Sequence, residues 1–122
     1  MNLGPKLYKG YISAMSKLSF YVPESHLEVV KSALFAIGVG KIGNYDSCSW
    51  QNLGRGQFRA LEGSDPYIGQ KGAIETVVEF KVEMVCDDEL IKEAVDALRK
   101  AHPYEEPAYD VVKLLATAES EQ

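Results

Sequence analysis

The sequence predicts an α+β domain of the ferredoxin-like type: a βαβ-βαβ sandwich with an inserted β-hairpin and an antiparallel sheet that carries two helices on one face. Three observations support this fold. Apolar residues alternate with their neighbours over residues 17–22 and again over residues 74–86, as in half-buried strands. Apolar residues at helical spacing follow both segments. A chain of 122 residues is long enough for one such core.

The first strand covers residues 17–22 and ends at Pro23. Proline is favoured in the first turn of a helix, and an apolar stripe recurs after it. Gly38 and Gly40 then predict the end of this helix. The stripe consists of Leu27, Val30, Leu34 and Ile37.

The middle of the chain predicts a hairpin and an irregular connection. Tyr45 and Trp50 favour β-structure, and Gly54-Arg55-Gly56 is typical of a turn, so we expect a hairpin that runs to Leu61. Residues 62–72 contain three glycines and a proline and predict an irregular connection. The glycine-rich residues 54–56 and 68–72 do not match a phosphate-binding motif. We therefore interpret both stretches as turns.

Residues 74–86 form the clearest strand, and it is much longer than the ~5–6 residues of a usual strand. We therefore expect it to extend beyond the domain and to contact a partner. Asp87 and Asp88 predict the N-cap of a second amphipathic helix, which Pro103 ends. A last strand is predicted over residues 109–115.

The chain divides into three parts. Residues 15–116 are predicted to form a single domain, and residues 117–122 a polar tail. Residues 1–14 show no sustained period, so we interpret them as a non-native extension. The alternative is an ordered arm that packs on a neighbour through Tyr8, Tyr11 and Ile12.

Composition excludes several classes of function. A net charge of −5 without any run of Lys or Arg argues against nucleic-acid binding. Apolar runs fall far short of the ~20 residues of a membrane helix, and no secretory signal is visible. Cys48 and Cys86 are too few and too far apart for a disulfide scaffold, so we expect a reduced, cytoplasmic protein.

Three stretches carry a family resemblance: residues 41–49 (KIGNYDSCS), residues 66–69 (PYIG) with Gly72 and Glu75, and residues 102–110 (HPYEEPAYD). They resemble the domain inserted in the middle of YqfO-type proteins, of the Ngg-interacting-factor-three-like (YbgI/DUF34) family. The resemblance implies a fold similar to CutA and the PII signalling proteins, which assemble into trimers through extended strands. It implies no hydrolase activity, because the family's two-metal centre belongs to the flanking domains.

Residues 102–110 hold two prolines, two tyrosines, three carboxylates and one of the two histidines of the chain. His102 and Glu106 are candidate ligands of a divalent metal. The structural alternative is that His102 hydrogen-bonds to the backbone while Tyr104 and Tyr109 pack against the sheet. Glu75, Glu79 and Glu83 lie on one face of the predicted strand, where they could bind a cation, but a solvated face with Lys81 between them explains them adequately. The candidate ligand-binding residues are Tyr45, Cys48, Tyr67, Glu75, His102, Tyr104, Glu105 and Glu106.

These features predict a trimeric PII/CutA-like regulatory module that binds a small ligand or a metal, with no catalytic residue assigned. One alternative is a protein-protein interaction domain without a small ligand. The other is a small metal-dependent hydrolase that uses His102, Glu106 and Cys48. The expected partners are further copies of the chain and a small ligand or protein, with no nucleic acid and no membrane.

Overall fold

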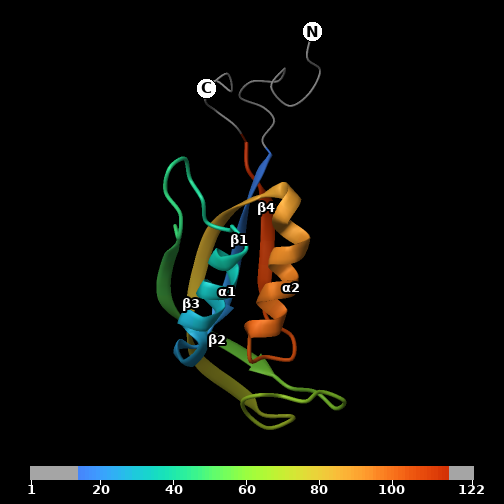
Figure 1. Ribbon diagram of the computed structural model, residues 1–122. Coiled ribbons are helices and arrows are strands. Elements are labelled where there is room, and N and C mark those ends of the chain that lie inside the picture. The colour runs from blue at the N-terminus through green and yellow to red at the C-terminus, as the bar shows by residue number, and fades with distance from the viewer. Residues whose placement is uncertain (1–13, 116–122) are drawn as a thin grey trace.

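The computed structural model describes residues 14–115, which form a four-stranded antiparallel sheet with two α-helices on one face (Figure 1). The order of strands in the sheet is β2-β3-β1-β4. The predicted α+β, ferredoxin-like fold is confirmed. The interpretation of residues 1–14 lies, apart from Ala14, outside the described residues, and that of residues 117–122 lies wholly outside them. The elements are β1 (Met15–Val22), a 3-10 turn (Glu24–His26), α1 (Leu27–Ala36), β2 (Trp50–Arg59), β3 (Ile74–Asp87), a 3-10 turn (Asp88–Leu90), α2 (Ile91–Ala101) and β4 (Tyr109–Lys113).

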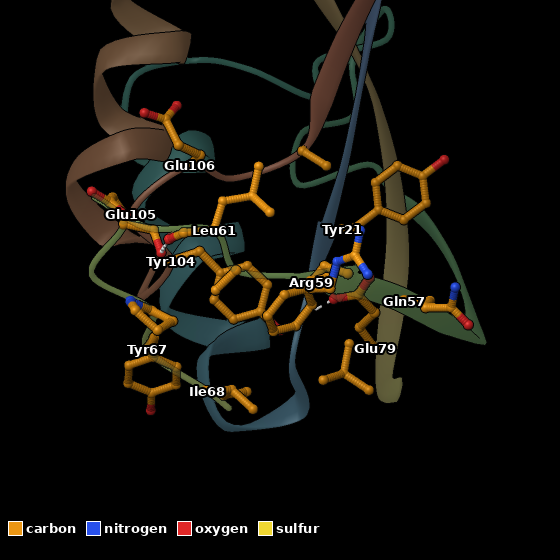
Figure 2. Close-up of a pocket in the computed structure, with 16 residues that line it drawn as sticks. Tyr21, Gln57, Arg59, Leu61, Tyr67, Ile68, Glu79, Tyr104, Glu105 and Glu106 are labelled. Atoms are coloured by element: carbon orange, nitrogen blue, oxygen red, sulfur yellow. Dashed lines mark hydrogen bonds between the residues drawn. The ribbon is translucent and has the colours of Figure 1, made fainter. Parts of the chain in front are cut away.

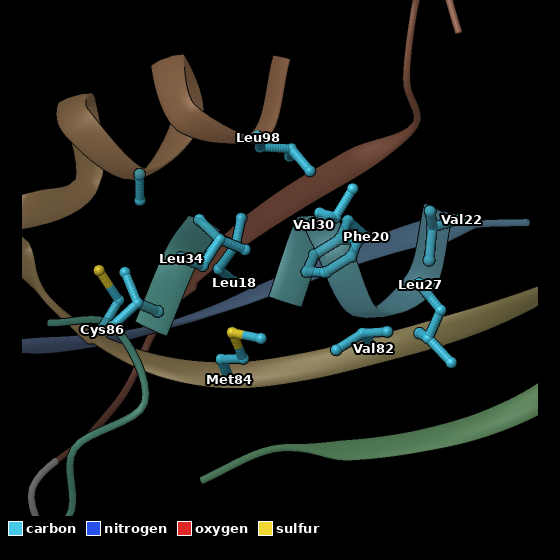
Figure 3. Close-up of a cluster of buried hydrophobic side chains, with 12 residues drawn as sticks. Leu18, Phe20, Val22, Leu27, Val30, Leu34, Val82, Met84, Cys86 and Leu98 are labelled. Carbon is cyan, nitrogen blue, oxygen red and sulfur yellow. The ribbon is translucent and has the colours of Figure 1, made fainter. Parts of the chain in front are cut away.

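The core lies between the helices and the central strands β1 and β3 (Figure 3). The alternation of β1 directs Leu18, Phe20 and Val22 toward the helices, and its partner β3 adds Val82 and Met84. Burying each such side chain stabilises the fold by about 1.5–3 kcal/mol. The helices contribute their apolar stripes: Leu27, Val30 and Leu34 from α1, and Ala94 and Leu98 from α2.

The predicted hairpin around Gly54-Arg55-Gly56 was wrong. These residues lie inside β2, a single strand that pairs with β3 from Trp50 opposite Glu83 to Arg59 opposite Ile74. The long β3 offers backbone partners to all ten residues of β2, and this pairing outweighs the turn preference of glycine. The chain reverses instead in residues 60–73, which have no regular secondary structure and are called the 60–73 connection below.

The predicted overhang of β3 is observed. Met84 and Cys86 are buried beneath the helices, whereas Val78 and Ile74, on the same face of the strand, are 57% and 61% exposed. Leu53 lies opposite Phe80 on this face and is exposed as well. Leu53, Ile74 and Val78 together are called the apolar overhang below.

The predicted N-cap at Asp87 and Asp88 was wrong, because neither side chain caps the helix. The Asp88 carboxylate instead accepts a hydrogen bond from Ser16 Oγ at 2.7 Å and pairs with Lys113. These partners, Lys113 first, lower the pKa of Asp88. Asp88 therefore connects β1 and β4 to the turn that precedes α2.

Candidate functional site

His102 forms the joint between α2 and the loop of residues 102–108, called the 102–108 loop below. Its ring is buried, and Nε2 lies 2.6 Å from the carbonyl oxygen of Tyr21. Nδ1 accepts the backbone N–H of Tyr104 at 3.1 Å. These partners select the neutral tautomer with its proton on Nε2. Burial lowers the pKa of His102, and the ring has the backbone-bonded role of the structural alternative.

Tyr104 connects this joint to β3. Its hydroxyl donates to Glu79 Oε2 at 3.2 Å, and its ring centroid lies 4.8 Å from that of His102. On its other side, the ring of Tyr67 lies 6.1 Å away and contacts His26 edge-on. Three separate segments of the chain thus bring four rings together.

The two acidic residues after Tyr104 have different environments. Glu105 Oε1 accepts the backbone N–H of Asp65 at 2.9 Å, so it ties the 102–108 loop to the 60–73 connection. Glu106 is exposed and lies 4.0 Å from the guanidinium of Arg99. Glu105 therefore shapes the site, whereas Glu106 lies at its border.

A pocket of about 450 Å³ opens between the ends of β2 and β3, the 60–73 connection and the 102–108 loop (Figure 2). Figure 2 shows Tyr104 and Glu79 pointing toward each other within it. Most lining side chains are aromatic or aliphatic. The lining residues are Tyr21, Gln57, Phe58, Arg59, Ala60, Leu61, Ser64, Pro66, Tyr67, Ile68, Val77, Glu79, Tyr104, Glu105, Glu106 and Ala108.

Glu79 and Tyr104 are electrostatically coupled. Burial raises the pKa of Glu79, and the hydrogen bond from Tyr104 only partly opposes this effect. Burial and the adjacent Glu79 raise the pKa of Tyr104 to about 12. At neutral pH Tyr104 therefore stays protonated, and its hydroxyl donates a hydrogen bond to the Glu79 carboxylate.

Four of the predicted ligand-binding residues, Tyr67, Tyr104, Glu105 and Glu106, line the pocket. His102 supports Tyr104 from behind, and Glu75 lies against Gly69 of the connection.

Tyr45 and Cys48 do not join the pocket. Tyr45 is 75% exposed, and the Cys48 thiol lies 3.6 Å from the carbonyl oxygen of Asp46 in its own loop.

Glu79 lines the pocket but is not among the predicted ligand-binding residues, because a solvated strand face was preferred there over a cation site. That interpretation was wrong for Glu79. A Cβ at Gly56 would lie 2.4 Å from Glu79 Oε1, so the carboxylate packs against bare backbone. A glycine within a strand often marks such a close approach, but the sequence placed Gly56 in a turn and not in a strand. The other polar or aromatic lining residues that the prediction did not include are Tyr21, Gln57, Phe58, Arg59 and Ser64.

The geometry offers no support for a metal site at His102 and Glu106. Both ring nitrogens of His102 have backbone partners, and Glu106 lies beside Arg99. Among residues 14–115, no three His, Cys, Asp or Glu side chains gather where they could hold a metal ion. Cys48, the third residue of the hydrolase alternative, does not line the pocket. Neither helix in this part of the chain is long and apolar enough to cross a membrane.

Comparison with known proteins finds relatives that are much longer than this chain. No protein-family model matches it. It is 45% identical over 101 residues to the GTP cyclohydrolase 1 type 2 homolog of Mycobacterium tuberculosis and 41% identical over 101 residues to that of Bacillus subtilis. Each match covers 83% of this chain and 27% of the relative.

Solved structures give the same result. A Bacillus cereus protein related to NIF3 superposes with a TM-score of 0.75 and 38% identity, over 89% of this chain and 28% of that one. CutA from Archaeoglobus fulgidus superposes with a TM-score of 0.61 and 16% identity, over 82% of this chain and 83% of that one. Arabidopsis thaliana PII, bound to citrate, superposes with a TM-score of 0.56 and 17% identity, over 84% and 77%. The chain is therefore a relative of one segment, about a quarter of the length, of the NIF3/YbgI-type proteins named GTP cyclohydrolase 1 type 2 homolog, and it has the fold of CutA and PII.

Proposed function

We propose that this chain is a regulatory module that binds a small ligand in the pocket beside Glu79 and Tyr104. The observation that carries the proposal is the pocket itself, whose volume of about 450 Å³ is within the range of small-molecule sites. Its composition is also typical of such sites, since aromatic and aliphatic side chains surround a few polar groups.

The proposal concerns binding rather than catalysis. Glu79 and Tyr104 can orient a ligand through hydrogen bonds, whereas the backbone occupies both nitrogens of His102. The chain spans only 27% of the length of its relatives, so the reaction in their name is not assigned to it. The solved PII structure with bound citrate supports a ligand-binding role for a protein of this fold.

The test is a thermal-shift screen of metabolite-sized ligands, followed by NMR mapping of each hit. A ligand of this pocket should perturb the amide signals of Tyr104 and Gly56. The variant Tyr104→Phe keeps the ring but removes the donor to Glu79, so we expect affinity to fall by about fivefold to tenfold.

Tyr45→Phe is the matched control, because it removes the hydroxyl of an exposed tyrosine outside the pocket. Hits that perturb only residues outside the pocket, or a screen without any hit, would contradict the proposal.

We also propose that copies of the chain associate, as trimers, through the apolar overhang. Leu53, Ile74 and Val78 are exposed together at one end of the sheet, and exposed apolar patches often mark interaction sites. The same surface supports the second candidate function, a protein-protein interaction domain without a small ligand. A cytoplasmic location is part of the proposal, because the thiols of Cys48 and Cys86 are both free, as in a reducing compartment.

A further inference from the structure

The pocket contains more negative than positive side chains. Glu79, Glu105 and Glu106 line it, and Arg59 is the one cation among the lining residues that the structure describes. Glu105 is already committed to the N–H of Asp65, and Glu106 is exposed beside Arg99. Glu79 is thus the carboxylate that a bound molecule would meet.

The Glu79 carboxylate can accept further hydrogen bonds. A carboxylate offers about four lone-pair positions, and the Tyr104 hydroxyl occupies one of them. Contact with Gly56 limits the movement of the carboxylate away from the pocket. Among residues 14–115, no Lys, Arg or His side chain forms an ion pair with Glu79, and burial raises its pKa.

The walls of the pocket suit the same kind of ligand. Tyr21, Phe58, Tyr67 and Tyr104 line it with aromatic rings, whose electron-rich faces attract cations. One such contact already exists at its border, where Lys81 Nζ lies 6.0 Å from the ring centroid of Tyr21. The apolar and aromatic lining also provides room for a flat, poorly hydrated body.

We propose that the pocket selects an organic cation with a flat apolar body, whose protonated amine or amidine nitrogen donates to the Glu79 carboxylate. This inference rests on the proposed function and adds the chemical class of the ligand. The positive charge of the ligand would neutralise the Glu79 carboxylate. The aromatic rings of the pocket would contact the flat apolar part of the ligand.

The experiment uses the full chain and three probes that share one ring and differ in charge: benzamidine, benzamide and benzoate. Binding is followed by NMR titration of the Tyr104 and Gly56 amides. Benzamidine should bind most tightly. Glu79→Gln keeps the shape of the side chain and removes its charge, so it should weaken benzamidine binding by about tenfold or more. The same change should leave the affinity for benzamide within about twofold.

Glu93→Gln is the matched control, because it removes one negative charge from the exposed face of α2, outside the pocket. It should leave the affinity for all three probes unchanged. Benzamidine affinity should rise with pH as Glu79 ionises, and this dependence should vanish in Glu79→Gln. If Glu79→Gln weakened benzamidine binding only by damaging the packing of the pocket, the affinity that remained would still depend on pH.

Two results would overturn the cation class while leaving a binding function in place. The first is that benzoate binds most tightly of the three probes and that Arg59→Gln weakens its binding. The second is that benzamidine and benzamide bind the wild-type protein equally well. Amides of Tyr104 and Gly56 that respond neither to these probes nor to the wider ligand screen would overturn both proposals. An amidine effect that persists in Glu79→Gln would exclude Glu79 as the anchor.

Discussion

The ring of His102 is buried between two backbone groups that require opposite hydrogen-bonding roles. The carbonyl oxygen of Tyr21 needs a donor, and the N–H of Tyr104 needs an acceptor. Only the neutral imidazole provides both. A second proton on Nδ1 would face the N–H of Tyr104 and break the link between α2 and the 102–108 loop.

His102 should therefore make stability depend on pH. Its pKa in the folded protein is lowered, so its contribution is present above the unfolded pKa of about 6.5 and is lost as the pH falls through the folded pKa. Urea unfolding between pH 7 and pH 5 should show the wild-type protein losing stability on acidification. His102→Gln should be less stable at pH 7 and should lose less stability over this range.

His26→Gln is the control for this prediction, because His26 is the other histidine and is half-buried in the turn before α1. Because the charge of His26 is only the last cause of the lowered pKa of His102, this variant should keep most of the wild-type pH dependence. Glu79 acts in the opposite direction: its pKa is raised, so its contribution is present at low pH and is lost as the pH rises. Equal pH dependence in His102→Gln and the wild-type protein would show that His102 is not the titrating group.

The sequence predicted part of the site at this scale. The density of polar and aromatic residues in 102–110 indicated Tyr104 and Glu105, and both line the pocket. Glu79 escaped because alternation assigns a residue to a strand face without saying what covers that face. Its cover comes from Tyr104, 25 residues further along the chain.

Most helices and strands follow from local patterns. The apolar periods predicted β1, β3, β4 and both helices within a few residues of their observed bounds. The prediction of a hairpin turn at Gly54 and Gly56 was wrong because the role of a glycine in a strand depends on the partner strand. Gly56 accommodates Glu79, and only the register of β2 against β3 reveals this contact.

Replacing a glycine by alanine should change the stability differently after a helix than in the middle of a strand. Gly40, which follows α1, has a φ of +82°, and a Cβ there would lie 2.7 Å from the carbonyl oxygen of Cys48. Gly40→Ala should reduce the free energy of unfolding by about 1–3 kcal/mol, because it adds backbone strain and a clash.

Gly54→Ala is the comparison, since a Cβ there meets no atom within 4 Å and its φ is not positive. Its free energy of unfolding should stay within about 1 kcal/mol of the wild-type value or exceed it. Urea unfolding of both variants provides the measurement. Similar losses at the two positions would contradict the assigned strain at Gly40.

At the scale of the whole molecule, few topologies accommodate the predicted order of strands and helices, so the order sufficed to predict the fold class. The pocket could not be predicted in the same way. Its walls come from β1, the β2-β3 overhang, the 60–73 connection and the 102–108 loop, and only the folded chain brings them together.

The apolar overhang should determine the size of the particle in solution. Val78→Lys combined with Leu53→Lys places two charges on this surface, so the trimer that we propose should dissociate to single chains. Size-exclusion chromatography with light scattering measures the mass. Val29→Lys is the matched control, because Val29 is an exposed valine of α1 outside the overhang, and it should leave the mass unchanged.

Single chains in the wild-type protein would contradict association. Trimers that persist in the double variant would place the interface elsewhere.

The pairing of β1 with β4 has a consequence for how this domain can be joined to other proteins. Ser16 lies opposite Lys113, and the N–H of Leu114 donates to the carbonyl oxygen of Met15 at 3.1 Å. A polypeptide that enters the sheet at Met15 therefore leaves it one strand spacing away, about 4.8 Å. Because entry and exit are neighbours, the unit can interrupt a surface loop of a host protein while the two cut ends of that loop stay together. For the same reason, joining the two ends by a short linker and opening the chain elsewhere should preserve the fold.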